Sequence, residues 1–207
     1  MILNPSFYEP LELDRGAHRV HLGLQPDLPT ALVLFGGEGS TEMIKIARAL
    51  NRAESGVQLI LLCGKNDAPA RELRAMKKEI PMFVEGFTRE VPYYMELADF
   101  LIGKPGPGSI SEALAKRLPV IVQRNAWTMA HERYNAAWVE KQGVGLVVRS
   151  FSADLLDAVR TLLAHGNYDR YRRRATEMSN SAVYEIPELL EAILRNTPPT
   201  RLRLLAS

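Results

Sequence analysis

Ala31-Leu-Val-Leu-Phe35, followed by Gly36-Gly37, is the stretch of sequence that decides the fold. An uninterrupted apolar run that ends on paired glycines is typical of a strand buried on both faces, as in a parallel sheet. Residues 41–52 come next, and their apolar side chains recur at helical spacing. A buried strand, a glycine turn and an amphipathic helix together predict the first βα unit of an α/β fold.

The same alternation continues along the chain. Further strands are expected at 57–63, 82–84, 100–102, 120–122 and 145–148, and helices at 41–52, 68–78, 91–97, 109–116 and 131–141. Strands separated by helices of this length form right-handed βαβ units, with helices on both faces of the sheet. We therefore expect a doubly wound, six-stranded parallel sheet in the order 3-2-1-4-5-6, which is a Rossmann-like three-layer α/β fold.

The pattern also predicts the boundaries of the domain. Residues 1–30 are rich in proline and read as a leading linker segment with one short helix near 14–24. The Rossmann-like domain is expected to span 31–195. Its last helices are expected to begin after an N-cap at Ser152 and to cover 168–179 and 187–195. Residues 196–207 lack periodicity and are expected to form a flexible tail.

Composition excludes several classes of protein. The chain has 207 residues, and 26 Lys and Arg against 24 Asp and Glu give a net charge of +2, so a general nucleic-acid binder is not expected. Cys63 is the single cysteine, which rules out an internal disulfide and favours a reducing compartment such as the cytoplasm. No apolar run approaches the roughly 20 residues that span a bilayer, and no secretory leader is recognisable.

Ligands of open parallel sheets bind at the carboxyl ends of the strands, where the strand order reverses. Here the first loop at that edge is Gly36-Gly37-Glu38-Gly39-Ser40-Thr41. Its three glycines would let the backbone approach a ligand, and the following helix N-terminus favours an anion. Glu42 replaces the third glycine of a dinucleotide fingerprint, and the Gly-Lys-[Ser/Thr] of a Walker A loop is missing. A flexible tight turn and a phosphate or sugar contact both stay open.

The second loop runs from Gly103 to Ala113 and reads Gly-Lys-Pro-Gly-Pro-Gly-Ser-Ile-Ser-Glu-Ala. It opens a helix, so the N–H groups of Gly108, Ser109 and Ile110 are expected to be free for an anion. Prolines between glycines such as Gly106 stiffen the loop, which lowers the entropy lost on binding. Two glycine-lined helix N-termini that face one crevice suit a diphosphate.

Glu112 has two interpretations. Ser109-x-x-Glu112 matches a capping box, and spacing alone favours that reading. Alternatively, its carboxylate accepts hydrogen bonds from two adjacent sugar hydroxyls, as acidic residues do for ribose.

His131-Glu132-Arg133-Tyr134-Asn135 opens the helix after the fifth strand. His131 and Asn135 share a helix face. The group is either a third contact to the ligand or an ordinary polar first turn in which Asn135 holds a neighbouring loop. The basic run 168–174 is expected to be a solvated helix face, with an anionic lipid surface or RNA as open alternatives. No metal-ligating constellation is recognisable, and no metal or cofactor is expected.

Taken together, these motifs resemble the C-terminal donor domain of GT-B glycosyltransferases, in particular the monogalactosyldiacylglycerol synthase group and the similar MurG-type family. The likeness rests on Phe35-Gly-Gly-Glu-Gly-Ser40, the Gly86-Phe-Thr88 turn, Lys104-Pro-Gly-Pro-Gly-Ser-Ile-Ser-Glu-Ala113 and Glu132…Asn135. It covers about residues 15–148.

The resemblance implies a UDP-sugar donor. The Phe87 backbone would meet the uracil and Glu112 the ribose. The first loop from Gly37 through Glu38 and Gly39 to Ser40, together with Gly108 and Ser109, would hold the diphosphate. The turn before Asn135 would face the sugar. His131 stands where these families usually carry Gln, which leaves the hexose open between galactose, glucose and N-acetylglucosamine.

The resemblance further implies an inverting hexosyltransferase that acts on a lipid acceptor such as diacylglycerol, with peripheral contact with a membrane as an open alternative. No catalytic residue is assigned, because the general base of this family belongs to an N-terminal domain that the chain has no room for. That domain is either missing from a fragment or supplied by a second chain. The competing classes are a non-catalytic binding or assembly module, a UDP-sugar epimerase and an NAD-dependent oxidoreductase. Cys63-Gly-Lys-Asn66 after the second strand argues against the last, because it lacks the acidic residue that binds ribose.

Overall fold

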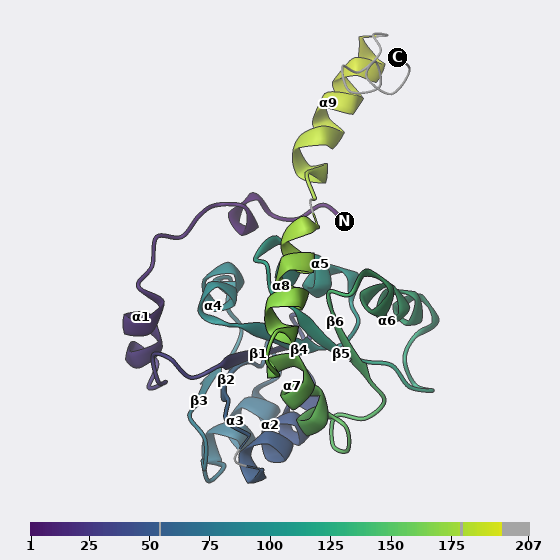
Figure 1. The fold of residues 1–207 in the computed structure, drawn as a ribbon. Coiled ribbons are helices and arrows are strands. Elements are labelled where there is room, and N and C mark those ends of the chain that lie inside the picture. The colour runs from purple at the N-terminus through teal and green to yellow at the C-terminus, as the bar shows by residue number, and fades with distance from the viewer. Residues whose placement is uncertain (54, 179, 196–207) are drawn as a thin grey trace.

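A computed structural model describes residues 1–53, 55–178 and 180–195. Six parallel strands form one sheet in the order β3-β2-β1-β4-β5-β6, which confirms the predicted order and fold class (Figure 1). The strands are β1 (Thr30–Leu34), β2 (Gln58–Leu62), β3 (Met82–Glu85), β4 (Phe100–Gly103), β5 (Val120–Gln123) and β6 (Gly145–Val148).

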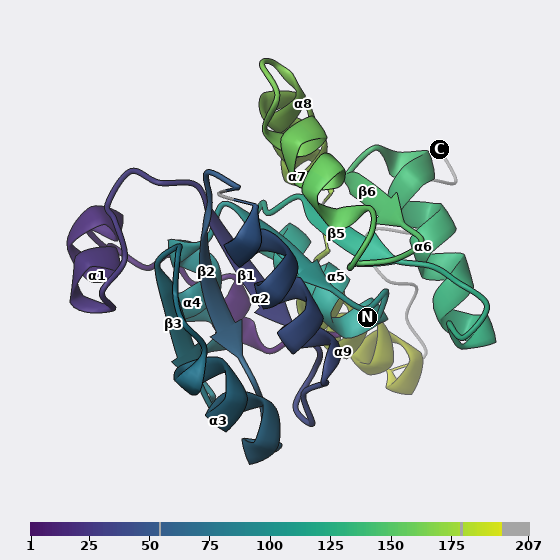
Figure 2. The same cartoon turned by 90° about the horizontal axis from the view of Figure 1, so that it is seen from below.

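Helices cover both faces of this sheet. The helices among the described residues are η1 (Pro5–Phe7), α1 (Arg15–His21), α2 (Glu42–Arg52), α3 (Asp67–Ala75), α4 (Val91–Leu97), α5 (Pro107–Ala115), α6 (Ala130–Gln142), α7 (Leu155–Leu163), α8 (Asn167–Glu177) and α9 (Ala182–Leu194), of which α9 extends away from the sheet. One face packs against α2, α3 and α7, and the other against α4, α5 and α6 (Figures 1 and 2).

Alternation along β1 explains why both faces are covered. Ala31 and Val33 belong to the core on the α2 side, whereas Leu32 and Leu34 belong to the core on the α5 side. Every residue of β1 and β2 is buried. Successive side chains of a strand point to opposite sides, so a strand buried on both faces is apolar along most of its length. The two buried polar residues of β1 and β2, Thr30 and Gln58, hydrogen bond to each other at the strand starts. The continuous apolar runs in the sequence therefore follow from the three-layer fold.

The starts of α7 and α9 differ from the sequence-based prediction. The N-cap of α7 is Asp154 and not Ser152, and no side-chain hydrogen bond caps the helix. Asp154 Oδ2 instead accepts hydrogen bonds from the N–H groups of Arg149 and Ser150, in the turn before the helix, at 3.1 and 3.0 Å. Helix α9 begins at Ala182, with Pro187 inside it, although proline usually marks a first helical turn. The predicted flexible tail at 196–207 lies outside the described residues.

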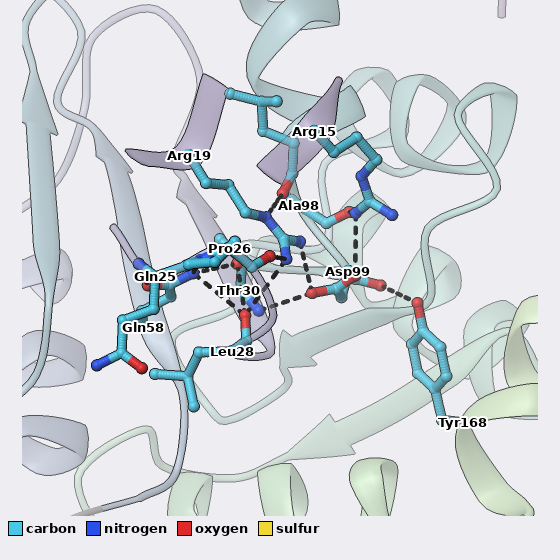
Figure 3. A network of polar contacts seen from close by, with 11 residues as sticks. Arg15, Arg19, Gln25, Pro26, Leu28, Thr30, Gln58, Ala98, Asp99 and Tyr168 are labelled. Carbon is cyan, nitrogen blue, oxygen red and sulfur yellow. Dashed lines mark hydrogen bonds and ion pairs between the residues drawn. The ribbon is translucent and has the colours of Figure 1, made fainter. Parts of the chain in front are cut away.

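The leading segment is tied to the sheet by a network around Asp99, at the amino end of β4 (Figure 3). Asp99 pairs with Arg15 at 2.9 Å and with Arg19 at 2.8 Å, and it accepts from the Thr30 N–H at 2.8 Å. The Arg19 side chain is only 6% exposed and also donates to the Leu97 carbonyl. A buried guanidinium needs such partners, because an unpaired charge in the interior is strongly destabilising.

We predict that Asp99→Ala lowers the free energy of unfolding by about 2–4 kcal/mol, because it leaves Arg19 buried without its carboxylate. Urea denaturation monitored by circular dichroism measures this loss. Glu72→Ala is the control, since the Arg48–Glu72 pair is exposed and should contribute less than about 1 kcal/mol. Equal losses in the two variants would contradict the prediction.

Candidate functional site

The strand order reverses between β1 and β4, which lie side by side with Leu34 opposite Gly103. A Cβ on Gly103 would lie 2.3 Å from the Leu34 carbonyl oxygen, so only glycine permits this close approach. Helix α2, after β1, packs on one face of the sheet, and α5, after β4, packs on the other. The two loops therefore leave neighbouring strands and diverge, as at the ligand-binding edge of doubly wound folds.

The first loop is held against the loop after β2. Gly39 has φ +68°, and a Cβ there would lie 1.9 Å from the Cys63 carbonyl oxygen. The Gly64 Cβ would lie 2.4 Å from the Gly37 carbonyl oxygen, which accepts from the Lys65 N–H at 2.9 Å. Gly39 is therefore required for the packing of the two loops, and its predicted contact with a ligand stays a prediction. Gly37 is exposed, and a Cβ there would have no atom within 4 Å.

The capping box expected at Ser109 and Glu112 is wrong. Helix α5 begins at Pro107 with Gly106 as N-cap, because the fixed φ of proline suits the first helical position. Ser109 is then the third helical residue, and its Oγ donates to the Gly106 carbonyl at 3.4 Å. The Ile110 N–H also donates to that carbonyl, at 3.1 Å, so the expectation that it is free is wrong. Gly108 and Ser109 keep the N–H groups that a first helical turn leaves without an intrahelical partner.

Glu112 does not cap α5 and instead lines a cavity of about 150 Å³. Gly36 and Gly37 of the first loop, Phe87 of the β3–α4 turn and Glu112 of α5 meet in this Glu112 cavity. Burial raises the pKa of the Glu112 carboxyl. Within the described residues, its carboxylate has no hydrogen bond or ion pair to another side chain or to the backbone. A half-buried carboxylate without a protein partner is available to a ligand that donates hydrogen bonds.

Lys65 connects the first loop with the Phe87 ring, which lines this cavity. Its Nζ lies 3.2 Å from Glu38 Oε1 of the first loop and 5.8 Å from the centroid of the Phe87 ring. Glu38 and Phe87 are both exposed, so a ligand could reach the aromatic ring without displacing core side chains.

Helix α6 holds the second loop through two contacts. Asn135 Nδ2 donates to the Pro105 carbonyl at 2.9 Å, as the simpler interpretation of this residue predicted. Glu132 is buried, and its Oε1 lies 3.3 Å from Lys104 Nζ. His131, in contrast, is exposed.

Glu132 and Lys104 also line a second cavity of about 510 Å³, which Ser40 and Trp127 border as well. The first loop separates this Glu132 cavity from the Glu112 cavity, since Gly37 lines one and Ser40 the other. The remaining predicted site residues, namely Glu38, Gly39, Gly106, Gly108, Ser109, His131 and Asn135, line neither cavity. Sequence reasoning assigned no role to Lys104 or Trp127, although Lys104 directly follows β4 at the ligand-binding edge.

Within the described ranges, no group of three or more His, Cys, Asp or Glu side chains is arranged to hold a metal ion. No helix among these residues is both long and apolar enough to cross a membrane.

Comparison with known proteins is consistent with this geometry. The family model "Glycosyltransferase family 28 C-terminal domain" matches residues 30–190. A probable monogalactosyldiacylglycerol synthase 2 of Oryza sativa subsp. japonica is 32% identical over 197 residues, which are 89% of this chain and 40% of that protein. The chain thus spans less than half the length of the curated relatives it matches.

Two solved structures share the fold. MurG of Acinetobacter baumannii has a TM-score of 0.64 at 18% identity, over 89% of this chain and 54% of that one. Os79 of O. sativa, in complex with UDP and deoxynivalenol-3-glucoside, has a TM-score of 0.63 at 18% identity, over 84% of this chain and 41% of that one.

We predict that Gly39→Ala destabilises the protein by about 3 kcal/mol or more, because the methyl group overlaps the Cys63 carbonyl at a positive φ. Gly37→Ala is the matched control on the same loop, and its unfolding free energy should stay within about 0.5 kcal/mol of the parent. Thermal or urea unfolding compares the two. A neutral Gly39→Ala would show that the contact between the loops is dispensable.

Proposed function

This chain belongs to the glycosyltransferase family 28 C-terminal domain family, and on that basis we propose that it is the UDP-hexose-binding half of an inverting glycosyltransferase. The carrying observation is that Gly37, Phe87 and Glu112, from three separate elements, line one cavity at the strand-order reversal. We also propose the domain limits 31–195 for this half, with 1–30 as its leading linker.

The Glu112 cavity is suited to a nucleoside. Its walls combine glycine backbone with the exposed Phe87 ring and one carboxylate. Adjacent ribose hydroxyls would donate two hydrogen bonds to Glu112, and the uracil would lie at the Gly86–Thr88 turn. Hydrogen bonds to the ionised carboxylate offset the desolvation that raises its pKa in the free protein. The absence of a protein partner for Glu112 supports this assignment over a structural role.

The diphosphate would lie at the start of α5. Gly108 and Ser109 offer free N–H groups there, and the helix dipole favours negative charge. The first loop borders the same region through Gly37 and Ser40. Lys104, whose side chain is 42% exposed, adds a positive charge between the nucleotide and the Glu132 cavity.

The transferred hexose would occupy the Glu132 cavity, with the turn before Asn135 facing it. The Glu132 carboxylate and the Lys104 ammonium can accept from and donate to sugar hydroxyls. His131 at the start of α6 leaves the identity of the hexose open, and galactose is favoured by the names of the relatives. Those names also favour diacylglycerol as the acceptor.

Catalysis by this half would consist of leaving-group stabilisation. The acceptor oxygen forms a bond to the anomeric carbon while the bond from that carbon to the β-phosphate oxygen breaks, and the electron pair stays on UDP. Preorganised N–H groups and the α5 dipole stabilise that developing charge. The base that removes the acceptor proton belongs to an N-terminal domain, which a longer chain or a second chain supplies.

The chief alternative is a non-catalytic binding or assembly module, or a subunit of a split transferase. A UDP-sugar epimerase would isomerise UDP-sugar without an acceptor, and an NAD-dependent oxidoreductase would respond to NAD(H).

We predict that UDP raises the melting temperature of this chain in a dose-dependent way, and that Glu112→Gln weakens UDP binding about 10- to 100-fold. A charge-assisted hydrogen bond of this kind contributes about 1.5–3 kcal/mol. Differential scanning fluorimetry and titration calorimetry measure the two effects. Glu90→Gln is the control, because Glu90 is exposed and lines neither cavity. No shift with millimolar UDP, or a shift with NAD(H) alone, would contradict the proposal.

We also predict that Glu112→Gln makes the ligand-free protein more stable than the parent at neutral pH. Burial raises the Glu112 pKa in the folded state, because it disfavours the charged carboxylate. Stability is then greatest below the unfolded pKa of about 4.3 and falls as pH rises through the folded pKa. Glu112→Gln should remove this fall and raise the melting temperature at pH 7 by about 1–3 °C. A melting temperature lowered by Glu112→Gln would instead favour a structural role.

A further inference from the structure

We propose that the outer edge of β6 binds an extended, acidic segment of another protein, which would add a strand to the sheet. The segment would lie in a groove of about 490 Å³ between β6, the end of α6 and α8, which we call the β6 groove. Gly145 and Val147 line it from β6, and Arg170 and Arg174 line it from α8. The β6 groove shares no lining residue with the Glu112 and Glu132 cavities, so the proposal does not depend on the nucleotide site.

The outer side of β6 offers backbone groups for strand pairing. β6 is one of the two edge strands of the sheet, and β3 is the other (Figure 2). The Val144 and Val148 carbonyls accept hydrogen bonds from the β5 side of the sheet at 3.1 and 2.8 Å. Because backbone groups alternate in direction along a strand, those of Gly145 and Val147 point away from β5. Within the described residues, no other protein group hydrogen bonds to them, so they can pair with an added strand.

The other edge strand, β3, is closed by side chains of the protein itself. The Glu85 carbonyl accepts a hydrogen bond from the β2 side of the sheet at 2.9 Å, so Met82 and Val84 are the outward-facing residues. The Met82 carbonyl accepts from Lys78 Nζ at 3.0 Å, and the Val84 carbonyl accepts from Arg74 Nη2 at 3.2 Å. Basic side chains at a sheet edge hinder pairing with a further strand. β6 has no such cover in the part of the chain that the structure describes, and it is therefore the edge available to a partner.

The charges around the β6 groove favour an acidic partner. Lys141, Arg170 and Arg174 line the groove together with a single carboxylate, Glu140, which is already in an ion pair. Arg174 pairs with Glu177, but both side chains are about half exposed, and such a pair contributes little. The excess of positive charge attracts an acidic segment and disfavours a basic one.

The basic run 168–174 divides into two groups at this groove. Arg170 and Arg174 are four residues apart and share a helix face, and both line the groove. Arg172 and Arg173 are equally exposed but do not line it. A nucleic acid held by charge alone would use all four arginines and would not need the edge of β6. A peptide strand matches both features of the groove, the two arginines and the outward backbone groups of β6.

The first test measures binding of the whole chain to a dye-labelled heptapeptide of alternating Glu and Val, by fluorescence anisotropy. We expect saturable binding of this acidic peptide and none of its counterpart with Lys in place of Glu. Arg170→Glu/Arg174→Glu should weaken binding about tenfold or more. Arg172→Glu/Arg173→Glu is the matched control, because it makes the same change of charge on the same helix, and it should bind within about twofold of the parent. Equal losses in the two variants, or no binding by the parent at millimolar peptide, would overturn the proposal.

The second test separates strand pairing from attraction by charge. The acidic peptide methylated at every backbone nitrogen keeps its charge but cannot donate from its backbone, so we expect about tenfold weaker binding. Val147→Pro removes an outward N–H from β6 and spares the pairing with β5, and it should weaken binding to a similar extent. Val84→Pro on β3 is the matched control and should bind like the parent, with circular dichroism to verify folding of both variants.

The methylated peptide decides the question if Val147→Pro does not fold. Undiminished binding of that peptide would show that charge alone holds it, and this would overturn the proposal. Both tests are made without UDP, so their failure is distinct from failure of the nucleotide site.

Discussion

The close approach of β1 and β4 is the constraint on which the rest of the site depends. Gly103 allows the backbone of β4 to meet the Leu34 carbonyl without a side chain between them. Right-handed crossovers then send α2 to one face of the sheet and α5 to the other. The loops that lead into these helices must diverge, and the space between them is where the two cavities open. The reversal of strand order between β1 and β4 thus produces the crevice.

The two loops at this edge are held rigid from opposite sides. The loop after β2 supports the first through Gly39, Gly64 and the Lys65 N–H. Helix α6 supports the second through Asn135 and Glu132. Backbone groups that are preorganised in this way stabilise charge without reorganising when a ligand arrives. The Glu112 carboxylate has no protein partner among the described residues, so nothing there offsets the desolvation that raises its pKa in the free protein.

The amino-end edge of the sheet carries a network of charged groups that stabilises the fold. Asp99 gathers Arg15, Arg19 and the Thr30 N–H at the amino ends of β1 and β4, and this network fastens α1 to the sheet (Figure 3). Here the Asp99 carboxylate and the Arg19 guanidinium satisfy each other, whereas the carboxyl edge keeps the Glu112 carboxylate and the first N–H groups of α5 available to a ligand. Such a division between a paired edge and an open edge is typical of parallel α/β domains, in which ligands bind outside the carboxyl ends of the strands.

The sequence by itself determined the layers, the strand order and the edge that carries the site, because apolar runs and glycine turns are local signals of burial and chain reversal. It also singled out Glu112, Phe87 and Gly37 as candidate site residues, which the structure brings together in one cavity. It did not show which of the other candidates line that cavity. Tertiary structure decided that Ser109 does not cap with Glu112, that Gly39 serves a neighbouring loop, and that Lys104 pairs with Glu132. Each of these depends on a contact between segments distant in sequence or on where a helix begins, and spacing along one segment specifies neither.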